Sequence, residues 1–303
     1  MENKILKALK QPNVALEWLL QKSHLLYGLD DERYLRLMWL IKRGERLNLE
    51  NPVTYNEKLQ WLKLYDRKPL YTTIVDKITV KDYVTSIVGS EYIIPTIKVW
   101  DNCNAISVDD LPEKFVLKTN NGSSSAGVVV CKDKASFDLE SAKKHLRKSQ
   151  KGSVYKDTRE WPYKDIIPMV FAEQYLEDET GELRDYKFFC FDGEVKAMFV
   201  ATERFGDDVK FDFFDPDFNH IDLYQVHRMS GKQLEKPQGL DEMKLIAEKL
   251  SKGFAHVRVD LYNVKGKVYF GEITFFHHGG FAPFHPKEWD NTFGSWIKLP
   301  INN

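Results

Sequence analysis

The chain has 303 residues, which is enough for one large domain or two to three small ones. Its 44 Lys and Arg residues nearly balance 45 Asp and Glu residues, whereas a dedicated nucleic-acid-binding protein usually carries a marked basic excess. The apolar stretches are shorter than the ~20 residues that span a bilayer, and we find no signal peptide, so we expect a cytoplasmic protein without a membrane span.

The first third of the chain has the periodicity of helices. Apolar residues recur at helical spacing before residue 45, and Thr54 with Glu57 forms the capping-box pattern that begins a helix. We therefore expect helices at 5–20, 34–41, 54–64 and 75–88.

Strand-like segments dominate from residue 115 onward, interrupted by two helices. An Asp-Gly pair at 192–193 predicts a hairpin turn, and the polar, aromatic segment 151–163 is expected to be a mobile loop. We expect helices at 138–149 and 240–253, and strands at 115–118, 127–131, 170–174, 185–191, 195–202, 211–214, 255–262 and 267–273. This order predicts an α+β fold with mostly antiparallel sheets. The isolated cysteines Cys103, Cys131 and Cys190 are expected to be buried free thiols.

A glycine- and serine-rich loop follows the strand that ends at Lys118. Glycines allow backbone N–H groups to approach an anion closely, serine hydroxyls add donors, and a lysine supplies a fixed cation. The pattern is consistent with a phosphate-binding loop or with an ordinary hairpin that has a long polar turn. It matches neither a Walker A nor a Rossmann motif, because no G-K-S/T ending or following helix is present.

Two carboxylates occupy neighbouring predicted strands. A turn at 263–267 places Asp260 opposite Glu272, and Mg²⁺ favours carboxylate and phosphate oxygens. Arg258 alternates in phase with Asp260 and should point to the same face, where it can stabilise a transferring phosphoryl group. A surface salt bridge on a solvated sheet face is the alternative.

The order of these segments resembles the ATP-grasp superfamily, and within it the TupA-like amidoligases, named for a teichuronopeptide biosynthesis protein. The resemblance covers about residues 30–300. The shared segments are Asp76-Lys77 with Lys81, Asn51–Lys58, Trp61–Lys63, Leu111–Lys118, Ala172–Leu176, Asp185–Gly193, Arg258–Asp260 and Phe270–Phe275. It implies two α+β lobes that clasp ATP: a helical segment at 1–50, a preceding region at 51–110, a small lobe at 111–175 and a large lobe at 176–303.

The resemblance also implies roles for individual residues. The residues expected to bind the nucleotide are Lys77, Lys118, Ser123, Ser124, Ser125, Asp185, Lys187 and the hinge residues Glu173, Gln174, Tyr175 and Leu176. Asp260, Glu272 and Thr274 are the implied ligands of two Mg²⁺ ions, and Arg258 is the implied catalytic arginine. Lys118 is a second candidate catalytic cation, and Arg204 is a third, near the γ-phosphate or the acceptor. Many ATP-grasp ligases have Asn where this chain has Thr274, and relatives tend to have Lys-Cys-Asn-His where this chain has Lys118 to Asn121.

The implied reaction is ATP-dependent amide formation through an acyl phosphate. The expected substrates are an amine and a small-molecule or glycan-linked carboxylate, such as a uronic acid or amino acid of a surface (capsular) polysaccharide. Backbone N–H groups of Gly279 and Gly280 are candidates for binding the acyl oxyanion, and His277 and His278 have either a substrate-contacting or a structural role. A sugar or glycan kinase, a nucleotide-binding regulatory module and a glycosyltransferase-pathway protein are the alternatives.

Overall fold

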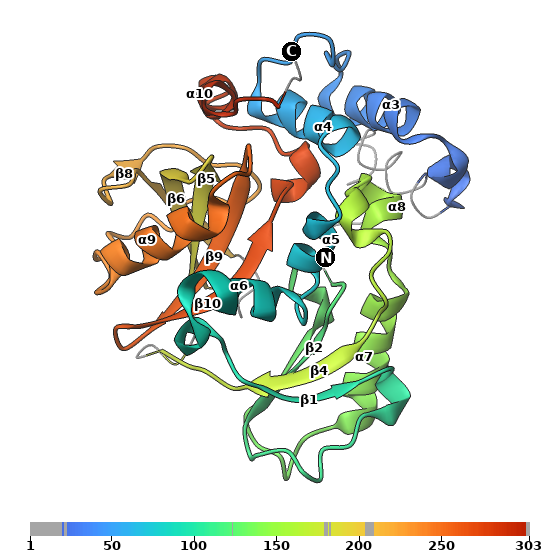
Figure 1. The fold of residues 1–303 in the computed structure, drawn as a ribbon, viewed down its shortest axis with the longest axis vertical. Helices are drawn as coiled ribbons and strands as arrows, with labels where there is room; N and C mark the ends of the chain where they lie inside the picture. The colour runs from blue at the N-terminus through green and yellow to red at the C-terminus, as the bar shows by residue number, and fades with distance from the viewer. Residues whose placement is uncertain are drawn as a thin grey trace.

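Two antiparallel sheets and their flanking helices form the molecule (Figure 1). The computed structural model describes residues 20, 23–122, 124–178, 181, 183–203 and 209–300. Its helices are α3 Asp31–Arg43, α4 Tyr55–Tyr65, α5 Leu70–Val75, α6 Val80–Val88, α7 Leu139–Lys151, α8 Val154–Thr158, α9 Leu240–Ser251 and α10 Glu288–Trp296. Its strands are β1 Thr96–Trp100, β2 Phe115–Thr119, β3 Val128–Cys131, β4 Val170–Gln174, β5 Asp185–Phe191, β6 Glu194–Thr202, β7 Lys210–Phe214, β8 His220–Ile221, β9 Val257–Val264 and β10 Lys267–Thr274. The predicted α+β class is confirmed.

The smaller sheet has the strand order β1-β4-β2-β3 and is covered by α7. Strand alternation sends Phe115 and Leu117 into an apolar core with Leu146 of α7, so Lys118 points to the opposite face. Asp138 caps α7 by accepting a hydrogen bond from the Ser141 N–H, and the helix predicted at 138–149 is confirmed as Leu139–Lys151.

The larger sheet has the order β10-β9-β5-β6-β7-β8, and α9 packs against its central strands. The face toward α9 is apolar, and its core includes Phe188, Val259 and Met243. The alternate residues of β5 and β9 therefore present their polar side chains to the other face. Asp192 and Gly193 both adopt positive φ, which confirms the predicted hairpin turn.

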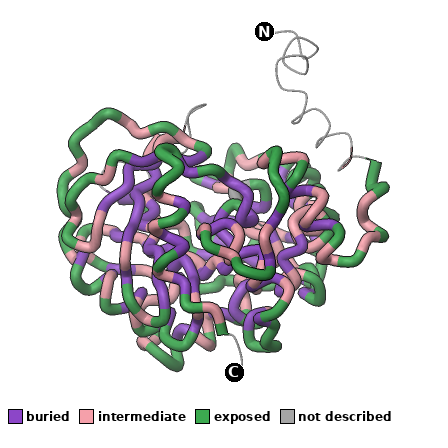
Figure 2. The backbone as a smooth tube through the Cα atoms, turned by 90° about the horizontal axis from the view of Figure 1, so that it is seen from above, coloured by how far each residue is buried: buried purple, intermediate pink, exposed green. Residues whose placement is uncertain are grey.

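Helix α4 packs against the core of the larger sheet, and α3 packs beside α4 on the side away from that sheet (Figure 1). Figure 2 shows that the buried segments lie in the interior of the molecule. Thr54 and Glu57 form the predicted capping box of α4. Tyr34, Trp39 and other apolar residues of α3 form a separate core with Phe281. None of the described helices is long and apolar enough to cross a bilayer.

The segment 151–163 was predicted as a mobile loop, and this prediction is wrong. It contains α8 and the 3₁₀ turn η5 Trp161–Tyr163. Arg159 is only 2% exposed and donates hydrogen bonds to the carbonyls of Leu26, Tyr27 and Leu29. Contacts with residues more than 120 positions away hold this segment, and local periodicity carries no signal of such contacts.

The helix predicted at 75–88 is also wrong in part, because residues 76–79 break it into α5 and α6. Asp76 Oδ1 accepts a hydrogen bond from the Ile78 N–H at 2.8 Å, and its other oxygen accepts one from Asn120 Nδ2 at 2.8 Å. An Asp side chain that bonds its own backbone two residues on favours a turn over a helix. Lys77 therefore lies in the turn between α5 and α6 and not within a helix.

Substituting Gly294 by Ala is expected to lower the free energy of unfolding by about 1–3 kcal/mol, the usual cost of overpacking. A Cβ atom at this position of α10 would lie 2.3 Å from the Val53 carbonyl oxygen and 2.7 Å from the Tyr55 nitrogen, both backbone atoms. Urea denaturation measures the change. Ser295→Ala, on the exposed side of α10, is the control and should change stability by less than about 0.5 kcal/mol. A Gly294→Ala protein as stable as the wild type would contradict this account of the helix contact.

Candidate active site

The predicted pairing of Asp260 with Glu272 is confirmed. They occupy the hairpin β9–β10 at one edge of the larger sheet, where Glu272 lies opposite Asp260 and Thr274 opposite Arg258. The register shifts between Phe270 and Glu272, at Gly271. A Cβ atom at Gly271 would lie 2.9 Å from the Asp260 carbonyl oxygen, so only glycine fits there without a shift.

Arg258 is the centre of the hydrogen-bond network on this face. Its Nε and Nη2 donate to the two carboxylate oxygens of Asp260, each at 2.7 Å, and Nη2 also reaches Thr274 Oγ1 at 3.1 Å. Glu272 Oε1 lies 3.5 Å away. Burial opposes the charged guanidinium, but Asp260 and then Glu272 outweigh it and raise the pKa of Arg258 above its ordinary value. The arginine is therefore a fixed, permanent cation.

The two carboxylates differ in accessibility. Asp260 is 1% exposed and contacts Lys187 of β5 as well as Arg258, while Lys187 also lies 3.3 Å from Asp185. The Glu272 side chain is 31% exposed and has longer contacts. Burial favours its neutral form, but Lys77, Lys187 and Arg258 prevail and lower the pKa of Glu272 to about 2.

The pair is chemically suited to Mg²⁺. An accessible, ionised Glu272 offers the hard oxygen that Mg²⁺ takes, and Asp260 offers a second one once Lys187 moves aside. Over the described part of the chain, no group of three or more His, Cys, Asp or Glu residues is arranged to hold a metal ion. Thr274, the third predicted ligand, uses its hydroxyl to accept from Arg258.

Lys77 joins the acidic pair to the glycine-rich loop. Its Nζ donates to the carbonyl of Gly122 and lies 3.3 Å from Glu272 Oε2. The Lys77 N–H donates to the Asn120 carbonyl at 3.3 Å, so the loop holds the lysine backbone as well. One ammonium therefore contacts both predicted elements of the site, although they belong to different sheets.

Lys118 and Glu173 form an ion pair on the face of the smaller sheet away from α7. Glu173 is 4% exposed, and its other oxygen lies 2.6 Å from Lys81 Nζ. Burial raises the pKa of Glu173, but Lys118 and Lys81 together lower it below its ordinary value. Lys81 was not predicted as a site residue. The sequence shows Lys81 four residues after Lys77. Because α6 begins at Val80, Lys81 lies in the first turn of this helix, and its side chain reaches Glu173 of β4.

The remaining hinge residues lie at or after the end of β4. The Gln174 N–H is already used, because it donates to the Pro95 carbonyl at 3.0 Å. The side chains of Gln174 and Tyr175 line a surface hollow of about 520 Å³ together with Pro95, Ile97, Pro112, Glu113 and Lys114. Alternation along β4 places this hollow on the side away from Glu173, and Leu176 follows the strand.

Of the other predicted residues, Asp185 is 2% exposed on β5, next to Lys187. Ser124 and Ser125 fall in the 3₁₀ turn η4 Ser124–Gly127 that leads into β3. Ser123 and Arg204 lie outside the described residues.

The turn η6 His277–Gly280 follows β10, the strand that carries Glu272. His277 is 1% exposed; its Nδ1 accepts from Arg258 Nη1 at 2.6 Å, and its Nε2 faces Gln225 Oε1 at 2.9 Å. Of the two roles left open, His277 has the structural one, and Gln225 is a supporting residue that the sequence did not indicate. The Gly279 N–H donates to the Phe276 carbonyl at 2.8 Å, so its predicted role in oxyanion binding is wrong.

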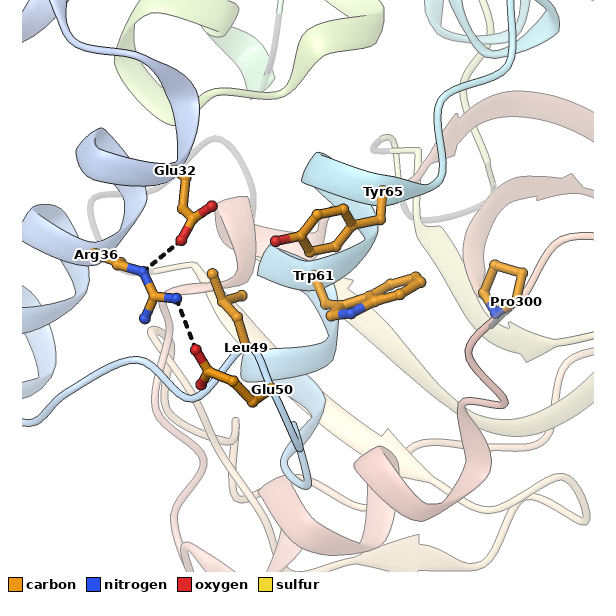
Figure 3. A pocket seen from close by; sticks show the side chains of 7 residues that line it. All are labelled: Glu32, Arg36, Leu49, Glu50, Trp61, Tyr65 and Pro300. Atoms are coloured by element: carbon orange, nitrogen blue, oxygen red, sulfur yellow. Dashed lines mark hydrogen bonds and ion pairs between the residues drawn. The ribbon is translucent and has the colours of Figure 1, made fainter. Parts of the chain in front are cut away.

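A separate groove of about 470 Å³ lies between α3 and α4, where Trp61 and Tyr65 project from α4 (Figure 3). Arg36 forms ion pairs with Glu32 and Glu50 at its edge. Leu49 and Pro300 complete its lining. None of these residues was predicted to take part in the site.

The family model described as TupA-like ATPgrasp matches residues 57–298, whereas a search of curated proteins gives no significant match. Among solved structures, D-alanine–D-alanine ligase from Bacillus anthracis complexed with ATP is 14% identical, with a TM-score of 0.38 over 67% of this chain and 54% of its own. The Helicobacter pylori D-alanine–D-alanine ligase is 15% identical, with a TM-score of 0.41 over 81% and 69%. The L-amino acid ligase from Bacillus licheniformis is 14% identical, with a TM-score of 0.46 over 84% and 57%. The chain thus spans little more than half of two of these ligases. Because the family model covers most of the sequence, the chain belongs to the TupA-like ATP-grasp family.

Proposed function

We propose that this chain is an ATP-dependent ligase that joins a carboxylate to an amine and releases ADP and phosphate. The observation that carries the proposal is the position of Lys77, whose ammonium contacts both the glycine-rich loop at Gly122 and the carboxylate of Glu272. A phosphate chain needs cations and N–H donors on one side and metal-binding carboxylates on the other. Lys77 and Lys118 supply the first, and Asp260 and Glu272 the second.

In the proposed reaction, a carboxylate oxygen of the substrate attacks the γ-phosphorus of ATP, and the bond to the β–γ bridging oxygen breaks. The amine nitrogen then attacks the acyl carbon, phosphate leaves, and the nitrogen loses one proton. Bound Mg²⁺, for which we propose two ions, would neutralise phosphate charge. Arg258 is held ready to stabilise the equatorial phosphoryl oxygens, because its geometry is fixed before substrate arrives. No protein nucleophile is needed, since phosphoryl transfer depends mainly on positioning and charge.

The family resemblance supports a finer proposal about the substrate. We propose a uronic acid or amino-acid carboxylate, free or glycan-linked, in the assembly of a surface polysaccharide, with the enzyme acting in the cytoplasm. The lobes 111–175 and 176–303 are proposed to clasp ATP between the two sheets, and Glu173 to Leu176 to form the hinge.

The test is a product analysis with Mg-ATP and a panel of uronic acids and amino acids, with and without amines. We expect ADP and free phosphate only where a carboxylate and an amine are both present, with an amide in the mass spectrum. ADP without free phosphate, with the phosphoryl group on a hydroxyl, would instead identify a kinase. AMP formation would contradict the acyl-phosphate mechanism.

A further inference from the structure

Helix α4 buries polar side chains on one flank. Asn56, Gln60 and Lys63 are each 0% exposed, although amide and ammonium groups are rarely buried completely. The apolar side of the same helix, with Tyr55 and Leu59, packs in the aromatic core. The polar flank faces the segment that follows β10, which is the strand carrying Glu272.

Gln60 and Lys63 bind the carbonyls of two adjacent glycines in this segment. Gln60 Nε2 donates to Gly280 O at 2.6 Å and Gly279 O at 3.2 Å, and Lys63 Nζ donates to Gly279 O at 2.7 Å. The turn is left-handed over three residues, because His278, Gly279 and Gly280 all have positive φ. A non-glycine residue in this conformation costs about 1–3 kcal/mol, so the surrounding contacts must impose it.

A fully buried lysine such as Lys63 is an unusual donor to a backbone carbonyl. Its other acceptors are Thr158 O at 2.7 Å and Gln60 Oε1 at 3.0 Å, and every hydrogen-bond acceptor of its Nζ within the described part of the chain is an uncharged oxygen. Burial lowers the pKa of Lys63 to about 7, with Glu160 opposing that shift. The ammonium is held by neutral oxygens and by the rings of Phe281 and Phe276, 4.9 and 5.6 Å from Nζ, and burying a charge without an anionic partner costs free energy. Stability alone therefore does not account for a lysine at this position.

The turn is connected directly to Arg258. His277, its first residue, accepts from Arg258 Nη1 at 2.6 Å and contacts Gln225 Oε1 at 2.9 Å. On the other side, the carbonyl of Ala282 accepts from Asn56 Nδ2 at 3.0 Å and Gln225 Nε2 at 3.3 Å. The segment is thus fixed at both ends, and Gln60 and Lys63 fix its middle.

We propose that Gln60 and Lys63 are positioning residues for catalysis: they hold the turn 277–280 so that His277 fixes the guanidinium of Arg258. The kinetic consequence of this inference, a lower kcat, rests on the proposed ligase function. Neither residue bonds Lys77 or Lys118, the lysines proposed to bind the nucleotide, so we expect a larger effect on the chemical step than on ATP binding.

Lys63→Met tests the proposal, with Lys58→Met as the matched control. Lys58 lies on the same helix and also donates to two carbonyls, Gly294 O at 2.8 Å and Ile297 O at 2.9 Å, away from the turn. We expect Lys63→Met to lower kcat by about 10- to 100-fold, the cost of a displacement of ~1 Å, with an unchanged KM for ATP. Lys58→Met is expected to lower Tm without changing kcat. Equal kcat in the two variants at 20 °C would overturn the proposal.

A second readout does not depend on turnover. Because His277 Nδ1 accepts from Arg258, its proton lies on Nε2, and long-range ¹H–¹⁵N spectra of histidine-labelled protein report this tautomer. His277→Gln assigns the signal. Lys63→Met should shift the His277 signal, whereas Lys58→Met should leave it unchanged. An unchanged His277 signal in Lys63→Met would refute the positioning role of Lys63. Gln60→Met, which keeps the lysine, provides the same comparison if Lys63→Met does not fold. If the wild type turns over no carboxylate–amine pair, the ligase proposal fails. The spectra still show whether Gln60 and Lys63 hold the turn 277–280 and His277 in place.

Discussion

Glu272→Gln is expected to abolish ATP turnover while leaving the fold intact. The substitution keeps the size of the side chain but removes the charge that would bind Mg²⁺. Changes to residues that merely support a metal ligand cost ~10–100-fold, and the loss of a ligand should exceed this. Steady-state ADP release at saturating ATP over a range of Mg²⁺ concentrations measures the effect. Glu242→Gln, an exposed carboxylate on α9 that accepts from Tyr92, is the control and should behave as the wild type.

The pH dependence of stability gives the same substitution an independent signature. The pKa of Glu272 falls from an ordinary 4.5 to about 2 on folding, so the folded protein binds fewer protons there than the unfolded chain. The carboxylate therefore stabilises the fold above pH 4.5, and this contribution disappears as the pH falls through about 2. Wild type should exceed Glu272→Gln in stability at pH 6 and lose that advantage toward pH 2. A variant with both wild-type turnover and wild-type stability at pH 6 would show that Glu272 is a solvated surface residue.

Arg258→Met is expected to have the second large effect, on both activity and stability. An arginine that stabilises a transferring phosphoryl group contributes ~10³–10⁵-fold to kcat, so we expect a loss of at least about 10³-fold. Among the described residues, the variant also leaves the buried Asp260 with Lys187 as its one charged partner. Removing one member of a buried ion pair typically costs about 3–5 kcal/mol. Urea denaturation and single-turnover ADP formation measure the two losses.

Arg258→Lys separates the two contributions. A lysine keeps the positive charge beside Asp260 but lacks the planar fork that reaches Asp260, Thr274 and His277 together. We expect it to recover more stability than activity. Full recovery of kcat by lysine would mean that charge alone, and not the fixed geometry of the guanidinium, is what the site requires.

Local patterns in the sequence predicted those parts of the fold that local interactions determine. The capping box at Thr54, the Asp192-Gly193 turn and the pairing of Asp260 with Glu272 each depend on residues close in the chain. The glycine- and serine-rich loop indicated Lys118, and the family resemblance added Lys77, whose position depends on contacts across the fold. The edge strand β1 and helix α10 were missed, because β1 is largely exposed and α10 is short.

The errors arose where distant residues override local preference. Residues 151–163 carry no clear periodicity, yet Arg159 is held by carbonyls of residues 26–29. Lys81 and His277 acquire their partners, Glu173 and Arg258, only when separate elements meet. Nothing in the spacing of Gln60 and Lys63 indicated their contact with residue 279, because that contact spans more than 200 positions.

This sequence separation has a consequence for synthesis on the ribosome. The bonds from Lys63 to Gly279 and from Lys58 to Ile297 join residues 216 and 239 positions apart. Contacts across such distances form late, since the entropy of closing a long loop must be overcome before they contribute. Helix α4 therefore leaves the ribosome long before its partners, and its polar flank stays hydrated until residues 277–297 emerge. The turn beside Arg258 is completed only then, so a nascent chain lacks this part of the site until residues 277–297 have emerged.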